Sequence, residues 1–423
     1  GAVRIEEMVN YFRYDYAEPE DDDPFAVHLE VAGCPWAPDH RLVRIGLKGA
    51  EIDLSERPPT NLVFLIDVSG SMDEPNKLPL LVRAFHLLVD SLRERDHVAI
   101  VVYAGSSGLV LPSTSGGRKD AIRAALDGLR AGGSTNGGEG IELAYRLAAD
   151  HFVEGGTNRV VLATDGDFNV GVASRDELVR LVQEKAKSGV FLSVLGFGTG
   201  NLQDSQLEEL ADKGNGNYAY VDGLPEAKKV LVEQMAGTLL TIAKDGKLQV
   251  EFNPALVAAH RLIGYENRAL AHQDFNDDAK DAGEIGAGHT VTALYEIVPA
   301  GRDVRVPGVD PLRYQTARGA TEAAATGELL TVKLRSKAPD GDTSRLVERR
   351  ATDAGARFDD ASTEFRFAAA VAEFAMLLRD SEHRGDANHD AVLEIARSSL
   401  GDDVTGWRAE FLDLVAKANS ITP

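Results

Sequence analysis

The middle of the chain alternates between two hydrophobic patterns. Between residues 60 and 244, short continuous apolar runs alternate with segments in which apolar residues recur at helical spacing. The apolar runs predict buried strands, and the helical spacing predicts amphipathic helices. The expected strands cover residues 61–66, 97–104, 159–164, 190–197 and 216–221, and the expected helices cover residues 78–92, 119–129, 138–152, 174–188 and 225–243. This alternation predicts an α/β fold with a doubly wound, mostly parallel sheet.

The segments on either side of this region follow a period of two. Residues 25–31 and 42–47 precede it, and residues 248–252, 291–297 and 330–334 follow it. Alternation of apolar and polar positions predicts strands with one buried face. Because neither block holds enough strands for a stable sheet, we expect one β-sandwich assembled from both sides, with the α/β domain inserted in it.

Helical patterns close both ends of the chain. A short amphipathic helix is predicted at the N-terminus. We interpret two apolar faces after residue 362 as packing surfaces; they comprise Phe367, Val371, Phe374 and Leu378, then Trp407, Phe411, Leu414 and Val415. The predicted organisation is residues 1–59 as that helix with the first sandwich strands, 60–244 as the α/β domain, 245–340 as the remaining strands, and 341–423 as a linker with a helical region.

The turn after the first α/β strand carries the most specific chemistry of the chain. Asp67, Ser69 and Ser71 stand at alternate positions of the sequence Asp-Val-Ser-Gly-Ser, directly after the apolar run. Alternate residues of an extended turn point the same way, so one carboxylate and two hydroxyls are aimed at one point above the sheet. Such oxygens suit a hard divalent cation, although the same residue types also cap helices.

Two further segments reach the same edge of the predicted sheet. Thr135 lies in the glycine-rich stretch of residues 131–138 and offers a third hydroxyl. Asp165 directly follows the apolar run of residues 159–164, which reads as a second buried strand. Because the carboxyl ends of parallel strands meet at one edge, we expect these side chains to converge with the first turn.

These three segments, in this order, resemble the von Willebrand factor A domain and its metal-ion-dependent adhesion site. The resemblance implies that Ser69, Ser71 and Thr135 touch the metal directly. It also implies that two carboxylates, Asp67 and Asp165, act largely through water. The implied cofactor is a divalent cation, with Mg²⁺ expected first and Ca²⁺ or Mn²⁺ as alternatives.

Composition narrows the classes of partner. The chain of 423 residues carries 45 basic and 67 acidic residues, which gives a formal net charge of -22. We therefore expect no nucleic-acid partner, because phosphate binding needs a basic surface. Cys34 is the single cysteine, so an internal disulfide and a cysteine-based zinc site are both excluded.

Longer motifs extend the resemblance to a more specific group of proteins. They are Val-Arg-Ile-Glu-Glu-Met-Val-Asn-Tyr-Phe at residues 3–12, the metal turn within residues 61–72, Asp-Gly-Asp-Phe-Asn-Val at residues 165–170, and Gly-Tyr-Glu-Asn-Arg at residues 264–268. Together they resemble the bacterial von Willebrand A-domain lipoproteins, which also have a C-terminal domain of unknown function. The resemblance implies an extracytoplasmic, envelope-anchored protein, in the periplasm or at the cell surface.

The start of the chain fits this expectation. It begins at Gly1 without a Met, and the sequence shows no signal peptide and no transmembrane run. We therefore expect that a targeting segment with its lipid anchor has been removed, and that these residues do not insert into the membrane directly.

Two further acidic clusters raise the question of a second cation. Asp73 and Glu74 follow the metal turn, where integrin β chains carry acids for an adjacent metal, but here they stand one position early. Acids in a first helical turn are favoured by the helix dipole in any case. Residues 274–284 match a calcium loop at its first, third and fifth positions, but Ala279 replaces the glycine and Glu284 comes one place early. We interpret them as a solvated turn.

Enzyme signatures are missing from the sequence. It contains no Gly-x-Ser-x-Gly elbow, no His-Glu-x-x-His and no Gly-x-x-x-x-Gly-Lys loop. We therefore expect a non-enzymatic protein whose metal keeps an open position for an Asp or Glu of a protein partner. Two alternatives remain: a structural envelope protein whose metal only braces the loops, and an adaptor of an ATPase-linked assembly.

Overall fold

The chain folds into two compact units. The computed structural model describes residues 3–20, 23–52, 57–104, 106–132, 137–166, 175–198, 204–233, 241–265, 285–302, 321–339, 341 and 343–421. One unit comprises Gly1–Ala50, Ala243–Ala282 and His289–Pro423, and is called the sandwich unit. The other comprises Glu51–Ile242 with Gly283–Gly288, and is called the α/β unit.

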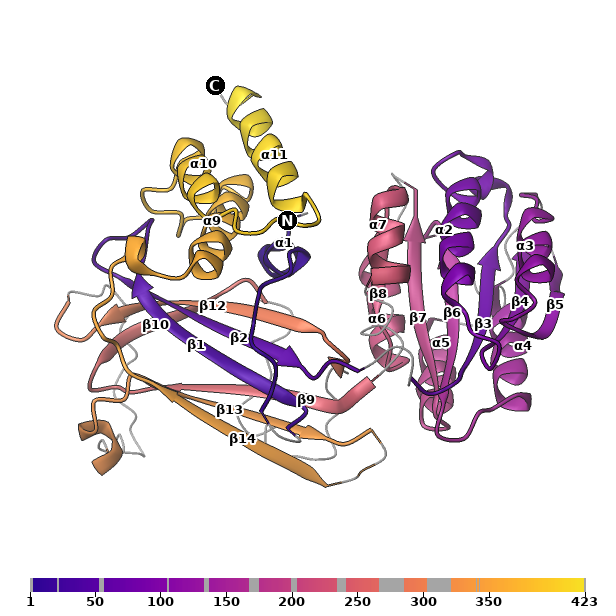
Figure 1. The fold of residues 1–423 in the computed structure, drawn as a ribbon, viewed down its shortest axis with the longest axis horizontal. Helices are drawn as coiled ribbons and strands as arrows, with labels where there is room; N and C mark the ends of the chain where they lie inside the picture. Colours follow the sequence, from indigo (N-terminus) through magenta and orange to yellow (C-terminus); the bar gives the residue numbers. More distant parts are fainter. Residues whose placement is uncertain are drawn as a thin grey trace. The chain divides into compact units, whose positions relative to one another are not determined.

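The α/β unit is built on a sheet with the order β5-β4-β3-β6-β7-β8 (Figure 1). Strands β4, β3, β6, β7 and β8 run parallel, and β5 runs antiparallel to β4. The strands are β3 (Thr60–Asp67), β4 (His97–Ala104), β5 (Ser106–Ser115), β6 (Thr157–Thr164), β7 (Val190–Phe197) and β8 (Tyr218–Val221). All positions of β3 are buried, which explains its continuous apolar sequence.

Helices cover both faces of this sheet. Leu62, Phe64 and Ile66 of β3 pack in one cluster with α2 (Leu78–Ser91), α3 (Lys119–Asp127) and α7 (Leu224–Lys228). Val63 and Leu65 point the other way and pack with α4 (Gly137–Asp150), α5 (Arg175–Ala186) and α6 (Asp204–Lys213). Alternate residues of one strand therefore serve two helical layers. The predicted doubly wound, mostly parallel α/β fold is confirmed.

Some elements of this unit differ from the sequence prediction. Strand β5 was not predicted, because it lies at the sheet edge, where Pro112 is tolerated although it lacks an amide hydrogen. Helix α6 was also missed. The predicted helix over 225–243 is too long: α7 continues as a π-helical turn at Lys229–Glu233, and β9 has begun by Thr241. Thr241 and the β-branched Ile242 favour extended backbone.

The sandwich unit contains a sheet of order β1-β2-β12-β10 and the strands β9-β13-β14 of a second sheet. The first holds β1 (Phe25–Gly33), β2 (Arg41–Gly49), β12 (Thr290–Pro299) and β10 (Val257–Ile263), and the second holds β9 (Thr241–Phe252), β13 (Leu330–Lys337) and β14 (Ser344–Ala351). Val43 and Ile45 of the first sheet share a buried core with Leu330 and Val332 of the second. This shared core defines the sandwich.

Strands from both sides of the α/β region meet in the first sheet. β2 pairs antiparallel with β12, from the pair Thr290↔Lys48 to the pair Ile297↔Arg41. The two strands are direct neighbours in space although the whole α/β unit separates them in sequence. The prediction of an α/β domain inserted in a β-sandwich is therefore confirmed.

The sandwich extends past residue 340, where a linker was predicted. β14 pairs with β13 along its whole length, from Leu330↔Ala351 to Lys337↔Ser344, so the linker assignment is wrong for these residues. The sequence of β14, Ser-Arg-Leu-Val-Glu-Arg-Arg-Ala, shows little apolar alternation because the strand lies at a sheet edge and buries mainly Val347. Charged residues on an edge strand also protect it from pairing with other chains.

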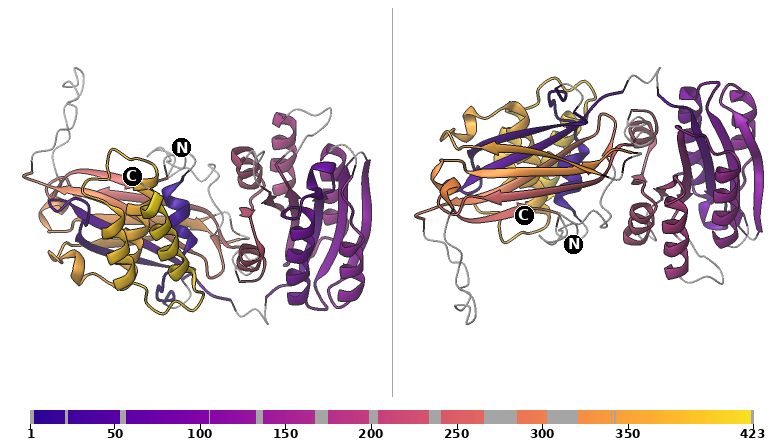
Figure 2. Two further views of the ribbon diagram at one scale, coloured as in Figure 1. Left: turned by 90° about the horizontal axis from the view of Figure 1, so that it is seen from above. Right: turned by 90° about the horizontal axis from the view of Figure 1, so that it is seen from below.

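Helices pack on the outer face of the first sheet (Figure 1 and Figure 2). They are α1 (Ile5–Tyr11), α9 (Thr363–Leu378), α10 (His389–Ser398) and α11 (Trp407–Ile421). The rings of Phe12, Phe367, Phe374 and Phe411 form a set of edge contacts, with centroid separations of 5.0 to 5.7 Å. The two predicted apolar faces after residue 362 thus lie largely in the core, except that Leu378 and Leu414 are exposed. Across the described ranges, no helix is long and apolar enough to span a bilayer.

Candidate metal centre

Asp67 ends β3 and is held from three directions. Its Oδ1 accepts a hydrogen bond from the Ser69 amide at 2.8 Å. Its Oδ2 accepts hydrogen bonds from the Tyr103 hydroxyl of β4 and the Thr164 hydroxyl of β6, both at 3.2 Å. Parallel pairing places Tyr103 opposite Asp67, so these contacts follow from the sheet register. The carboxylate, 0% exposed, is fixed before any ligand arrives.

The two serines of the turn offer a pair of hydroxyls. Ser69 stands at the N-cap position of the 3₁₀-helix Gly70–Asp73, where its side chain makes no capping hydrogen bond. Its Oγ is hydrogen-bonded to the Oγ of Ser71 at 2.9 Å. Oxygens at neighbouring corners of an octahedral Mg²⁺ site, each about 2.0–2.1 Å from the ion, are roughly 2.9 Å apart. The spacing therefore fits two adjacent ligands of one such ion.

Asp165 follows β6, and only one of its two oxygens has a hydrogen-bond partner among the described residues. The residue is 6% exposed, and its Oδ2 accepts a hydrogen bond from Lys77 Nζ at 3.2 Å. Its Oδ1 is buried and has no hydrogen-bond partner within the part of the chain that the structure describes. A buried oxygen without a partner is costly, so this atom calls for a donor, a water or a cation.

Electrostatics at this edge also favour a cation. Burial raises the pKa of Asp67; the hydrogen bonds from Ser69 and Tyr103 oppose that rise, and the charge of Asp165 adds to it. Two carboxylates thus share a poorly hydrated space at the carboxyl ends of adjacent strands. A divalent cation would relieve both desolvation and mutual repulsion. The donor set of hydroxyls and carboxylates fits the group that the resemblance implies.

Lys77 is a residue of this site that sequence reasoning missed. Its Nζ donates to the Ser71 carbonyl at 2.9 Å, to Asp165 at 3.2 Å and to Glu74 Oε1 at 3.3 Å. Desolvation alone would lower the pKa of Lys77, but the hydrogen bond and charge of Asp165 outweigh it and raise the pKa. Tyr103 and Thr164 were also missed. The only signal that could have pointed to them is the strand pairing, which places Tyr103 opposite Asp67.

The structure brings Asp67, Ser69, Ser71 and Asp165 to one edge of the sheet, while their role as metal ligands stays a prediction. Thr135 lies outside the described residues, and so do residues 274–284. Among the residues with a described placement, no three His, Cys, Asp or Glu side chains gather to hold a metal. The pair at Asp73 and Glu74 therefore has no third acid beside it in that part of the chain.

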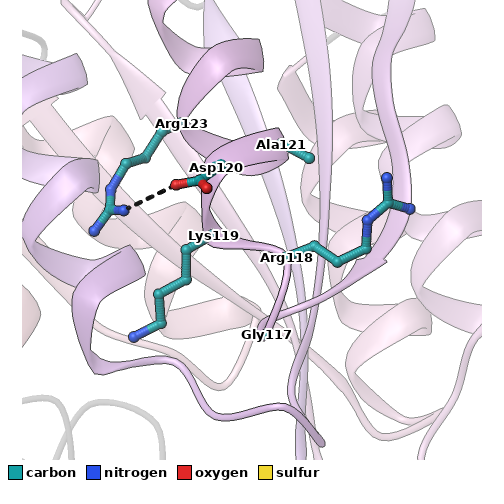
Figure 3. Close-up of a pocket in the computed structure, with 6 residues that line it drawn as sticks. All are labelled: Gly117, Arg118, Lys119, Asp120, Ala121 and Arg123. Atoms are coloured by element: carbon teal, nitrogen blue, oxygen red, sulfur yellow. Dashed lines mark ion pairs between the residues drawn. The ribbon is translucent and has the colours of Figure 1, made fainter.

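A hollow elsewhere on the α/β unit is unrelated to these residues. It is lined by the start of α3 and its approach, namely Gly117, Arg118, Lys119, Asp120, Ala121 and Arg123 (Figure 3). β5 ends at Ser115, which pairs with His97 at the start of β4. The hollow thus lies at the amino ends of the parallel strands, at the opposite edge from Asp67. Its basic groups are engaged locally: Arg123 pairs with Asp90 and Asp120, and Lys119 donates to the Asp90 carbonyl.

Comparison with known families agrees with this architecture. Residues 61–233 match the von Willebrand factor type A domain, and residues 237–421 match the family described as "Uncharacterized protein YfbK, C-terminal". Residues 1–44 match a further family described as von Willebrand factor. The matched boundary between residues 233 and 237 falls just before β9.

Individual relatives match the whole chain or a part of it. The chain is 43% identical over 428 residues to "Uncharacterized protein YfbK" of Escherichia coli (strain K12), which covers 100% of this chain and 73% of that protein. It is 30% identical over 196 residues to inter-alpha-trypsin inhibitor heavy chain H3 of Rattus norvegicus, covering 43% of this chain and 22% of the rat protein. A solved von Willebrand factor type A protein from Catenulispora acidiphila matches with a TM-score of 0.49 and 15% identity, over 94% of this chain and 91% of that one. On the full-length identity to the Escherichia coli protein, the chain belongs to the YfbK family of bacterial von Willebrand factor type A domain proteins.

Proposed function

We propose that this protein is a metal-dependent protein-binding module of the bacterial cell envelope. In this proposal Ser69, Ser71 and Thr135 hold a divalent cation directly, with Mg²⁺ favoured over Ca²⁺ and Mn²⁺. Asp67 and Asp165 stand behind water molecules. The partner is a protein that contributes one Asp or Glu side chain.

The observation that carries the proposal is the Oδ1 of Asp165, which has no hydrogen-bond partner among the described residues and lies at the same end of the sheet as a pair of hydroxyls. The acceptor is buried, and the Ser69 and Ser71 oxygens are spaced as two neighbouring ligands would be. Hydrogen bonds from β4 and β6 hold Asp67 in place. Such preorganisation supports a site built to bind an ion, because the protein is not required to rearrange when the ion arrives.

The charge of the ligands supports capture of an acidic group. Hydroxyl ligands are neutral, so a divalent cation held by them keeps positive charge and an open coordination position for an external carboxylate. The residues of the chain then orient that ion: Asp67 fixes the turn through the Ser69 amide, and Asp165 supplies a second negative charge at the edge.

The envelope location rests on the lipoprotein resemblance of the sequence motifs. Fractionation of cells that express the full-length gene product should place it with the envelope, and replacement of its N-terminal segment by a cytoplasmic start should release it. Recovery of the full-length protein in the cytoplasm would contradict this part of the proposal.

The binding proposal is tested by affinity capture from envelope extract. Chelation of divalent ions and Thr135→Ala should each reduce capture strongly, because each removes the ion or one of its ligands. The control is Thr326→Ala, which removes an exposed hydroxyl that donates to the nearby Ala323 carbonyl and accepts from the Glu328 amide. Conversion of one acidic residue of the captured partner to its amide should have the same effect as chelation.

Unchanged capture in chelator would overturn the proposal. The metal would then brace the loops only, and the binding surface would have to be sought on the sandwich unit. A partner that proves to be an ATPase, captured without the ion, would favour the adaptor alternative instead.

A further inference from the structure

Lys77 is confined at the metal site by three acceptors. The residue is 9% exposed, and its ammonium donates to the Ser71 carbonyl, to Asp165 and to Glu74. Two of these acceptors belong to the turn and its approach to α2, and the third stands 88 residues away at the end of β6. The ammonium therefore links the serine turn to the second carboxylate of the site.

The aliphatic part of Lys77 is also confined. It lies against Gly198, directly after β7, where a Cβ would come within 2.5 Å of the Lys77 Cε and 2.9 Å of its Cγ. Gly198 has φ +82, a conformation that side-chain-bearing residues rarely adopt. Its carbonyl accepts a hydrogen bond from the Tyr220 hydroxyl at 2.8 Å, which holds this backbone in place. The lysine side chain thus occupies space that any side chain at residue 198 would fill.

We propose that Lys77 is an internal cation of the metal site, which takes the place of the divalent ion in balancing Asp165 and thereby weakens metal binding. The inference rests on the proposed function and concerns the same site. Asp67 and Asp165 together carry two negative charges at this edge. Lys77 offsets one of them, because its ammonium is directly hydrogen-bonded to Asp165. A divalent ion therefore meets less attraction than the carboxylates alone would exert.

The Lys77 ammonium has opposite effects on the metal-free and the metal-bound states of the site. Without metal, the ammonium satisfies Asp165 Oδ2 and holds the turn through the Ser71 carbonyl. With metal, the same positive charge repels the ion across the carboxylate whose other oxygen, Oδ1, has no hydrogen-bond partner within the described ranges. At such short range and low hydration, one unit charge changes the affinity for a divalent ion by about tenfold or more.

The experiment measures Mg²⁺ binding by calorimetry in the full chain and in two variants, Lys77→Met and Lys77→Gln. Methionine keeps the length and apolar stem of lysine, and glutamine keeps donor hydrogens without the charge. Both variants should bind Mg²⁺ at least about tenfold more tightly. Both should also unfold at a lower temperature than the unaltered chain in chelator, and gain more thermal stability from saturating Mg²⁺.

Lys119→Met is the matched control. It changes the net charge of the protein by the same amount, but Lys119 stands at the opposite edge of the sheet and donates to the Asp90 carbonyl. Its Mg²⁺ affinity should stay within about twofold of the unaltered chain, because charges that far apart are screened.

The outcomes separate this inference from the proposed function. If the unaltered chain binds Mg²⁺ and both variants bind it equally or more weakly, Lys77 only positions Asp165 and the inference is wrong. If neither the unaltered chain nor the variants bind any of Mg²⁺, Mn²⁺ or Ca²⁺, the metal assignment itself fails and the inference fails with it. Binding that appears only in the variants would support the inference, since the lysine would then be the dominant cation of the site.

Discussion

Two buried carboxylates, Glu296 of the sandwich unit and Asp165 of the α/β unit, are satisfied differently. In the sandwich unit, Glu296 accepts hydrogen bonds from Trp36 Nε1 at 3.0 Å and Arg261 Nε at 2.9 Å, and it also contacts His40. In the α/β unit, Asp165 has one oxygen on Lys77 and the other without a partner among the described residues. A saturated carboxylate is a fixed part of the architecture, whereas an unsatisfied one keeps the capacity to bind.

The pKa directions agree with this contrast. Burial by itself would raise the pKa of Glu296, but the hydrogen bond from Trp36 and the charge of Arg261 outweigh burial and lower it. At Asp67, burial prevails and the pKa is raised. Glu296 is therefore compensated within the chain, whereas the hydrogen bonds to Asp67 only partly offset the effect of its burial.

Glu373 shows that a free oxygen alone does not make a site. It lies in α9, 1% exposed, with one buried oxygen lacking a partner in the described part of the chain. Burial raises its pKa to about 7, and the hydrogen bond from the Asn388 amide only partly opposes this. Because apolar side chains surround it, the carboxyl relieves its charge by taking up a proton. Asp165 differs from Glu373 because it lies at the carboxyl end of a strand in a parallel sheet.

The largest effect is expected from removing Glu296, the carboxylate whose oxygens are hydrogen-bonded within the chain. Glu296→Ala should lower the free energy of unfolding of the sandwich unit by about 3–5 kcal/mol, because it leaves the charge of Arg261 and the Trp36 N–H poorly paired. Both tryptophans of the chain, Trp36 and Trp407, lie in this unit, so their fluorescence in urea reports on it. The exposed Glu410→Ala is the control and should change the unfolding free energy by less than about 0.5 kcal/mol. If both variants lost a similar amount of unfolding free energy, the hydrogen bonds of Glu296 would contribute no more to stability than an exposed carboxylate does.

The pH dependence of Glu373 is the next largest effect. Below its ordinary pKa of 4.5 the carboxyl is protonated in folded and unfolded chains, so the stability of the neutral form is fully present; it is lost as the pH rises through about 7. A rise from 4.5 to about 7 corresponds to about 3 kcal/mol. Glu373→Gln should therefore stabilise the sandwich unit above pH 8 and leave it nearly unchanged at pH 4, by tryptophan fluorescence at both values. Equal effects at the two pH values would mean that the carboxyl does not titrate in this way.

Metal binding should stabilise one unit selectively. Mg²⁺ at about 100 times its dissociation constant adds about 2.7 kcal/mol to the state that binds it. Hydrogen exchange followed by mass spectrometry should slow in peptides of β3 and β6, and stay unchanged in peptides of β2 and β12. Asp67→Asn should weaken Mg²⁺ binding by about 10–100-fold, the usual cost of losing a group that orients metal ligands, and so reduce this protection at the same Mg²⁺ concentration. Protection in the sandwich strands alone would place the ion elsewhere.

The smallest effect is expected at Asp73. The residue is exposed on the 3₁₀-helix of the turn, and the acidic pair it forms with Glu74 has no third acid beside it in the described part of the chain. Asp73→Asn should change Mg²⁺ affinity by less than about threefold, because an exposed charge is largely screened. A second calorimetric binding step that disappears in this variant would instead establish an adjacent metal site.

The sequence was most informative where local pattern and burial coincide. β3 is continuously apolar from Leu62 to Ile66 because helices cover both of its faces, so the strand and the acid at its end were predictable. β10 and β14 were missed because edge strands bury few side chains and therefore show little alternation. Lys77 was missed because its long side chain reaches Asp165 across 88 residues, and no spacing rule describes such a contact.

The sequence by itself determined the doubly wound sheet, the insertion in a sandwich and the residue types at the strand ends, because these follow from periodicity and from the direction of parallel strands. Tertiary structure decided which oxygens are already satisfied. Tyr103 and Thr164 reach Asp67 only through strand pairing, and the free oxygen of Asp165 is defined by what surrounds it. Hydrogen-bond satisfaction depends on the positions of groups far apart in the chain, and those positions exist only after folding.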